Sequence, residues 1–142
     1  MNKRLIQRLL DEVVNAGRAE VLDELVSPDY YDHHPLPGTS PDIDGLKQRF
    51  AVRQQAFPDF RATILDLVSE GDKVALIMSG TGTHLGELMG APPTGKQFTI
   101  SEMHLFRVHN GKLIEHWGLT DFFSMLEQFG LIAAPWAAAA EA

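Results

Sequence analysis

The stretch FTISEMHLFRVHNGKLIEHWGLTD, residues 98–121, decides the fold because its pattern is typical of one β-hairpin. Asn110-Gly111 separates two runs in which apolar and polar residues alternate, and this dipeptide favours a two-residue type I′ turn. Such a turn fixes the register of the two strands. The predicted register pairs Val108 with Leu113, Phe106 with Glu115, His104 with Trp117, Glu102 with Leu119, and Ile100 with Asp121.

Side chains alternate between the two faces of a strand, so these ten side chains are predicted to share one face of the sheet. His104, Trp117 and Asp121 are then expected to line a cavity on that side. The opposite face would carry Met103, Leu105, Ile114 and His116. Because that face is largely apolar, we expect it to be buried against another chain.

Composition narrows the class of protein. The chain has 142 residues and no cysteine, which fits one domain with its own core and no disulfides. A formal net charge of −7 argues against a nucleic-acid partner. No apolar run approaches a signal segment or a membrane span, so we expect a cytoplasmic protein without membrane contact. The expected domain covers residues 1–134, and residues 135–142 are expected to form a flexible tail.

The remaining elements predict an α+β fold. Helical spacing predicts a first helix that ends near Gly17, a second stopped by Pro28, and a third opened by Ser40-Pro41 and closed by Pro58. Strands are predicted at residues 61–68 and 73–83, before a glycine-rich loop at 85–96, and a short helix at 122–129 ends the domain. A curved antiparallel sheet wrapped around the N-terminal helices would enclose a conical cavity, which is a common ligand site.

Several motifs are similar to those of one family. They are Tyr31-Asp32-His33-His34-Pro35, Ala56-Phe57-Pro58-Asp59, Glu70-Gly71-Asp72, Gly82-Thr83-His84-Leu85-Gly86-Glu87, Pro92-Pro93-Thr94-Gly95-Lys96, Asn110-Gly111-Lys112 and Glu115-His116-Trp117 with Asp121. In this order, from about Tyr30 to Leu131, the chain resembles the SnoaL-like polyketide cyclases, also called ester cyclases. The most specific parts are the segment from Gly82 to Lys96 and the Glu-His-Trp ending with its aspartate.

The resemblance implies the cone-shaped nuclear transport factor 2 fold and a homodimer or homotetramer. It also implies that a hydrophobic, polyketide-like small molecule undergoes intramolecular aldol condensation without metal or organic cofactor. In that chemistry one aspartate acts as general acid/base, and Asp121 is at the matching position.

The predicted catalytic residues are Asp121 and His104. An aspartate in an apolar cavity would have a raised pKa, which suits proton transfer near neutrality. Asp121 also precedes Phe122-Phe123-Ser124, where it could serve as an ordinary helix N-cap. His104 could stabilise an enolate, or it could be a satisfied core histidine.

The predicted substrate-binding residues are Trp117, His33, His34, Glu102 and Arg53. Trp117 would form a flat pocket wall. Only one of the adjacent His33 and His34 can face the cavity from an extended strand, and the family resemblance favours His33. Glu102 would pair with a cation, while Arg53 would either lie at the edge of the apolar stripe or meet a ligand carboxylate. His84 is expected to hold the glycine-rich loop, and His116 to be structural or interfacial.

Other functions remain open at this point. No His-x-x-x-His pair occurs, so we expect no metal site. With no cysteine and no Gly-x-Ser-x-Gly elbow, we expect no nucleophilic catalysis. The same fold could instead support epoxide hydrolysis or ketosteroid-type isomerisation, although Arg107 lies on the wrong face for the former. It could also be a binding protein that carries a lipophilic ligand without turning it over.

Overall fold

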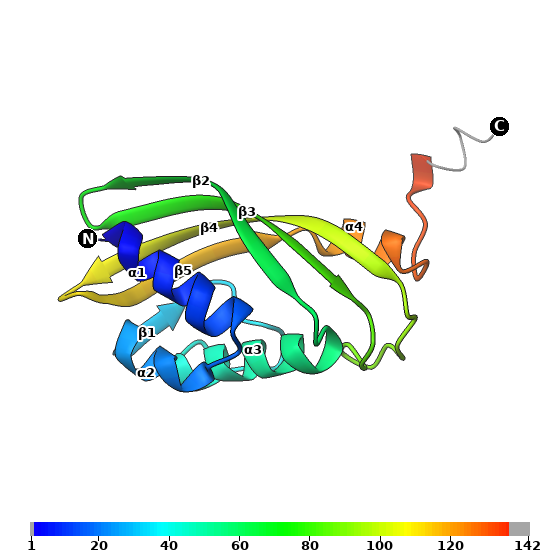
Figure 1. Ribbon diagram of the computed structural model, residues 1–142, viewed down its shortest axis with the longest axis horizontal. Coiled ribbons are helices and arrows are strands. Elements are labelled where there is room, and N and C mark those ends of the chain that lie inside the picture. The colour runs from blue at the N-terminus through cyan, green and yellow to red at the C-terminus, as the bar shows by residue number, and fades with distance from the viewer. Residues whose placement is uncertain (1, 137–142) are drawn as a thin grey trace.

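A five-stranded sheet curls over a layer of helices in the computed structural model, which describes residues 2–136 (Figure 1). The strands are β1 (Val26–Asp32), β2 (Arg61–Glu70), β3 (Lys73–Thr83), β4 (Gln97–His109) and β5 (Lys112–Thr120), in the sheet order β1-β5-β4-β3-β2. The α+β architecture predicted from the sequence is confirmed. The sheet is antiparallel from β2 to β5, but β1 pairs with β5 in parallel, which the sequence pattern did not predict.

The helices lie mainly on the concave side of the sheet (Figure 1). They are α1 (Asn2–Arg8), its π-helical continuation η1 (Leu9–Asn15), the 3₁₀ turn η2 (Ala19–Val21), α2 (Leu22–Leu25), α3 (Ile43–Ala56) and α4 (Phe122–Gln128). A π-helical segment is rare and often occurs at functional sites. No helix among residues 2–136 is both long and apolar enough to cross a membrane.

Two predicted helix boundaries are wrong. The second helix ends at Leu25, and Val26 and Pro28 belong to β1, where a proline is tolerated because β1 is an edge strand. The N-cap of α3 is Asp42, whose side chain accepts the Gly45 N–H at 3.1 Å, and Ser40 donates its hydroxyl to Asp42. The carboxylate therefore takes the capping role predicted for Ser40.

The predicted turn at Asn110-Gly111 is confirmed, since both residues have positive φ values of 49° and 73°. The register predicted beyond it is wrong, because Ile114 is an extra residue on β5. Val108 pairs with Leu113 as expected, but the next pair is Arg107 with Glu115. The bulge turns Glu115 to the outer face, where its carboxylate meets Arg107 Nε at 2.8 Å instead of being buried opposite Phe106.

The core fills the space between the concave face and the helices. Inward-facing side chains of the sheet, such as Val74 and Leu113, pack with α1 and η1 residues that include Ile6 and Leu10. Each such side chain contributes roughly 1.5–3 kcal/mol when fully buried. Directly after β3, buried His84 lies 3.0 Å from the Thr94 hydroxyl and so holds the glycine-rich loop in place, as predicted.

The expected flexible tail begins at Pro135, and residues 137–142 lie outside the described residues.

Candidate functional site

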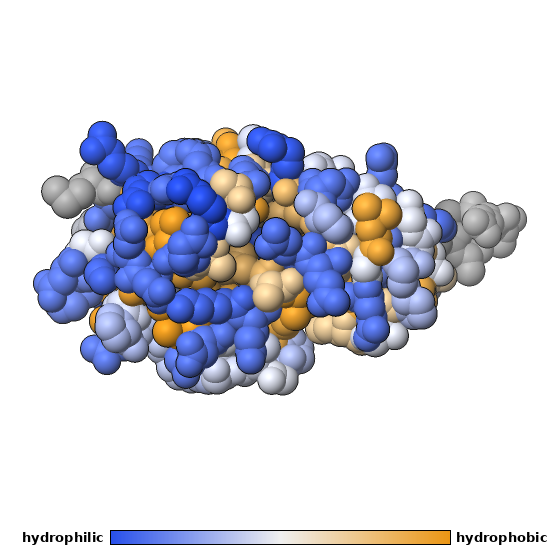
Figure 2. Space-filling view, turned by 60° about the horizontal axis from the view of Figure 1, so that its bottom comes forward, coloured by the Kyte–Doolittle hydropathy of each residue, from blue (hydrophilic) through white to orange (hydrophobic). Residues whose placement is uncertain are grey.

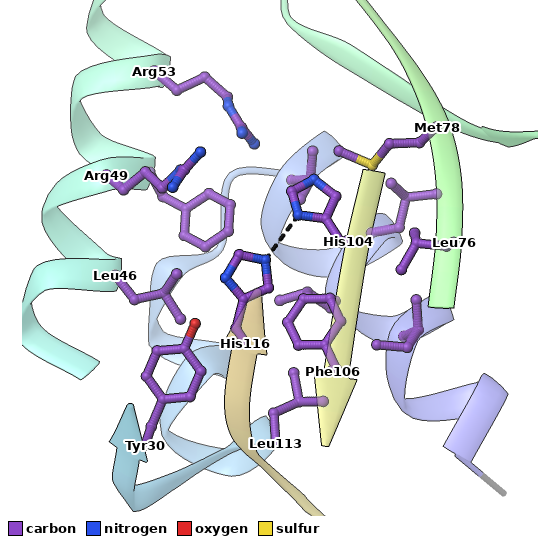
Figure 3. A pocket seen from close by; sticks show the side chains of 15 residues that line it. Tyr30, Leu46, Arg49, Arg53, Leu76, Met78, His104, Phe106, Leu113 and His116 are labelled. Atoms are coloured by element: carbon purple, nitrogen blue, oxygen red, sulfur yellow. Dashed lines mark hydrogen bonds between the residues drawn. The ribbon is translucent and has the colours of Figure 1, made fainter. Parts of the chain in front are cut away.

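Two histidines meet at the wall of an apolar pocket under the curled sheet (Figure 3). His104 comes from β4 and His116 from β5, while Arg49 and Arg53 extend toward them from α3 (Figure 3). Much of the remaining lining is apolar and includes Leu9, Leu10, Leu46, Phe50, Leu76 and Met78. The pocket has a volume of about 50 Å³. On the helical side of the molecule, hydrophobic residues are visible between polar ones (Figure 2).

The two histidines belong to a buried chain of polar groups. Asp32 Oδ1 lies 2.9 Å from His116 Nδ1, and His116 Nε2 lies 2.8 Å from His104 Nδ1. His104 Nε2 is in turn 3.4 Å from Glu102 Oε1. Asp32 and His116 are each 4% exposed and Glu102 only 1% exposed. Two carboxylates therefore flank a pair of imidazoles, shielded from solvent.

The backbone explains how these groups meet. Asp32 ends β1 beside His116, its register partner on β5, and the bulge at Ile114 turns His116 inward opposite Phe106. Gly118 lies beside the two imidazole rings. A Cβ added there would lie 2.5 Å from His104 Nδ1 and 2.6 Å from the His116 ring, so only glycine leaves room for the hydrogen bond between them.

The protons in this chain can be counted. Three contacts join four groups, but two neutral imidazoles carry only two N–H protons. If His116 donates from Nδ1 to Asp32, its Nε2 carries no proton, so His104 must donate from Nδ1 to His116. The His104 Nε2 that faces Glu102 then carries no proton. One additional proton would make all three contacts attractive. The arrangement is therefore suited to accept a proton and to release it again.

Electrostatics favour the state that can accept the proton. Burial lowers the pKa of His116, and the hydrogen bond that His116 donates to Asp32 only partly opposes this. Burial would raise the pKa of Asp32, but the hydrogen bond with His116 and the His34 N–H outweigh it and lower the pKa. At Glu102, burial is likewise outweighed, by the protonated form of His104, by Arg53 and by Thr120, and the pKa falls to about 2. The carboxylates are ionised at neutral pH, and His116 is neutral.

Arg53 is the charged partner of Glu102. Its Nη2 lies 3.7 Å from Glu102 Oε1, and its guanidinium stacks over the Phe60 ring at 4.6 Å. Burial lowers the pKa of Arg53, but an arginine remains charged. Glu102 Oε1 also accepts the Thr120 hydroxyl at 2.9 Å. As predicted from the alternation of β4, Glu102 and His104 face inward, and α3 brings Arg53 to them.

Asp121 and Trp117 are not in this cavity, so the predicted shared face of His104, Trp117 and Asp121 is wrong. Asp121 is exposed and caps α4 by accepting the Ser124 N–H at 3.1 Å. Trp117 faces outward opposite Leu105. The cause is the bulge at Ile114, which reverses the faces of all later residues of β5. The catalytic role of Asp121 remains a prediction.

Neither His33 nor His34 lines the inner pocket. On the outer surface, His33 stacks on Trp117 with ring centres 4.4 Å apart, and its Nε2 lies 2.7 Å from Glu115 Oε2. His34 lies at the sheet edge, where its Nδ1 accepts the Gly118 N–H at 3.2 Å. The family resemblance favoured His33 as the histidine that faces the cavity, but the side chain of His33 lies on the outer surface.

Sequence reasoning missed two members of the buried chain. His116 was assigned to the outer face, because strict alternation ignores a bulge. Asp32 was noted only as part of a motif, and its partner is 84 residues away. The pattern within either strand gives no signal of this pairing, which depends on β1 lying beside β5. Among residues 2–136, no group of three or more His, Asp or Glu side chains is arranged to hold a metal ion.

Comparisons with known proteins all indicate the same protein family. A family model described as SnoaL-like polyketide cyclase matches residues 4–129. The nogalonic acid methyl ester cyclase of Streptomyces nogalater is 31% identical over 124 residues, covering 86% of this chain and 90% of that protein. An aklanonic acid methyl ester cyclase of Streptomyces galilaeus is 25% identical over 132 residues, covering 91% and 89% of the two chains.

Solved structures share the fold. The wild-type IdmH structure from Streptomyces antibioticus has a TM-score of 0.79 at 38% identity and covers 90% of this chain and 97% of that one. TsrD from Streptomyces laurentii has a TM-score of 0.83 at 26% identity, with 92% and 95% covered. The curled sheet with helices on its concave side is thus common to these proteins.

Proposed function

The chain belongs to the SnoaL-like polyketide cyclase family, and we propose that it closes a ring in a hydrophobic, carbonyl-rich polyketide by an intramolecular aldol-type reaction. The proposal rests on the 2.8 Å hydrogen bond between His104 and His116 at the wall of an apolar pocket, with ionised Asp32 behind it. The reaction needs a group that takes and returns a proton near neutral pH, and imidazole is such a group. We propose that no metal or organic cofactor takes part.

In the proposed mechanism the imidazole pair acts as general base and then as general acid. His104 removes the acidic proton between two carbonyl groups of the substrate, and the resulting enolate attacks a ketone carbon of the same molecule. One carbon–carbon bond forms while the ketone π bond becomes an alkoxide, which regains the proton from the imidazole. Asp32 stabilises the imidazolium through His116, as a buried carboxylate does in hydrolytic triads. General acid/base catalysis of this kind contributes roughly 10²- to 10⁴-fold.

The pocket must widen to admit such a substrate. Its volume of about 50 Å³ holds one or two waters, whereas ligand sites typically measure about 300–1,000 Å³. The side chains that could move are the long ones on α3, including Phe50 and Arg49, both of which line the pocket. We therefore propose that the substrate enters between α3 and the sheet and displaces these side chains.

We propose that the protein assembles as a homodimer or homotetramer through the outer face of the sheet. Met103 and Leu119, register partners on β4 and β5, are 59% and 69% exposed there, and Val68 on β2 is 61% exposed. A contiguous apolar face of this kind is a common protein interface.

The function is tested by incubating the purified protein with nogalonic or aklanonic acid methyl ester, the compounds named for the related cyclases. Ring closure leaves the mass unchanged, so substrate and product are separated by their chromatographic retention, and an equal mass identifies the product as an isomer of the substrate. We expect conversion by the wild type and a loss of about 10²-fold or more in His104→Gln. His109→Gln, at the exposed tip of the same hairpin, is the matched control and should retain full activity. Equal activity of the two variants would contradict the proposed catalytic pair, and ligand binding without conversion would indicate a carrier protein.

A further inference from the structure

Three buried polar atoms without a hydrogen-bond partner belong to side chains that meet at Glu102. They are Arg53 Nη1, Glu102 Oε2 and His104 Nε2, and the only other such side-chain atom found among residues 2–136 is His84 Nε2. Glu102 Oε1 links the three residues, lying 3.7 Å from Arg53 and 3.4 Å from His104. Buried polar groups are nearly always satisfied, so a concentration of unsatisfied ones indicates a missing partner.

The free atoms define the chemistry of that partner. A guanidinium nitrogen can only donate, so Arg53 Nη1 requires an acceptor. The Glu102 carboxylate is ionised because its pKa lies near 2, so its free oxygen requires a donor. The two side chains approach within 3.7 Å through Arg53 Nη2 and Glu102 Oε1, so a single ligand with a neighbouring acceptor and donor suits the pair.

The free space at the site fits such a group. Arg53 lines two small cavities, one of about 50 Å³ shared with His104 and one of about 40 Å³ shared with Glu102 and Thr120. Each exceeds the roughly 30 Å³ occupied by one water molecule in the liquid. There is room here for one oxygen function on each side of the guanidinium, while the body of a ligand must occupy the widened pocket.

We propose that Arg53 and Glu102 form a recognition site for a neutral carbonyl–hydroxyl pair on the substrate, such as an enolised 1,3-dicarbonyl or a hydroxyaryl ketone. Arg53 donates to the carbonyl oxygen, and Glu102 accepts from the hydroxyl. A free carboxylate is disfavoured at this position, because it places negative charge against the ionised Glu102. This inference rests on the proposed function, in that it assumes that substrate binds in this pocket.

The same arrangement links recognition to chemistry. The carbon that loses a proton in an aldol-type reaction lies between two oxygen-bearing carbons, and the unpartnered His104 Nε2 adjoins the Arg53–Glu102 pair. Holding this oxygen pair would orient the substrate so that a separate, ketonic 1,3-dicarbonyl of the same molecule presents its acidic carbon to that nitrogen.

The inference is tested by calorimetric binding of three matched probes to the full chain. They are 1-acetyl-2-naphthol, its O-methyl ether, and 2-hydroxy-1-naphthoate. We expect the hydroxy ketone to bind at least about tenfold more tightly than the ether, which has lost the donor, and than the carboxylate. Losing one hydrogen-bond partner in a buried polar site typically has at least this effect.

Variants of Arg53 and Glu102 test whether these two residues cause the preference for the hydroxy ketone. Glu102→Gln should reduce the ratio of the affinities for the hydroxy ketone and its ether to about twofold or less. Arg53→Lys keeps the positive charge but loses the guanidinium group with its several N–H donors, and it should weaken binding of the hydroxy ketone about tenfold. The matched controls are Glu115→Gln and Arg107→Lys, which alter the ion pair on the outer face of the same strands and should leave all three affinities unchanged.

Equal binding of the hydroxy ketone and its ether to the wild-type protein overturns the inference without involving any variant. If His104-dependent cyclisation is then still observed, the proposed function survives and only the recognition site is wrong. If no probe binds and no cyclisation occurs, both are wrong.

Discussion

Replacement of Gly118 by alanine tests the geometry of the histidine pair. In a strand, alanine normally stabilises a protein relative to glycine by roughly 0.5–1 kcal/mol. Here the added Cβ would lie 2.5 Å from His104 Nδ1 and 2.6 Å from the His116 ring. Both rings are held by hydrogen bonds to buried partners, so neither can move freely. We expect Gly118→Ala to lower the free energy of unfolding by about 1–3 kcal/mol, the usual range for overpacking.

The assay is urea denaturation at pH 7, combined with turnover per folded molecule. Because the imidazoles are forced apart, turnover should fall roughly tenfold or more, toward the loss expected for removal of the acid/base group. A double-mutant cycle assigns the cause: a His104→Ala background removes the contact with His104 and lets the His116 ring move, so Gly118→Ala should cost less stability there. An unchanged or increased stability of Gly118→Ala in the wild-type background would refute the packing of the two rings around Gly118.

Three further predictions concern other parts of the molecule. Asp121→Asn should keep the melting temperature of the wild type, because asparagine caps a helix as well as aspartate does. If the histidine pair rather than Asp121 is the acid/base, turnover should also be kept; a drop of about 10²-fold at unchanged stability would instead assign the acid/base role to Asp121. The pKa of Glu102 in the folded protein is about 2, below its ordinary 4.5, so its contribution to stability is present above about pH 4.5 and is lost as the pH falls toward 2. Acid titration of stability should therefore be shallower in Glu102→Gln, and parallel curves for the two proteins would contradict the lowered pKa. Leu119→Lys, on the exposed outer face, should shift light scattering from an oligomer to a monomer at micromolar concentration, whereas a monomeric wild type would show that this face is not the proposed interface.

Local patterns in the sequence predicted local structure well. Asn110-Gly111 forms the expected turn because its positive φ values depend on these two residues alone. His104 and Glu102 face inward as predicted, since β4 alternates without interruption from the turn to Ile100. His84 holds the glycine-rich loop through Thr94, a partner only ten residues away.

Features that depend on tertiary contacts were not predictable in this way. Ile114 has no unusual chemistry, and its bulge depends on the pairing of Arg107 with Glu115 across the strands. One extra residue was enough to exchange His116 for Trp117 in the cavity. Asp32 reaches His116 only because β1 joins the sheet in parallel beside β5, and no periodicity within β1 indicates that partner.

The pH dependence of kcat/KM for ring closure tests most directly whether the imidazole pair accepts the substrate proton. The neutral pair is the active base, so kcat/KM should rise with pH through an apparent pKa that belongs to the coupled pair. Because burial lowers the pKa of His116, protonation of that imidazole should affect kcat/KM only on the acid side of an ordinary histidine. The acidic limb should disappear from the residual activity of the His104→Gln/His116→Gln double variant and remain in Asp121→Asn. An unchanged limb in the double variant, or its loss in Asp121→Asn, would show that the histidine pair is not the base.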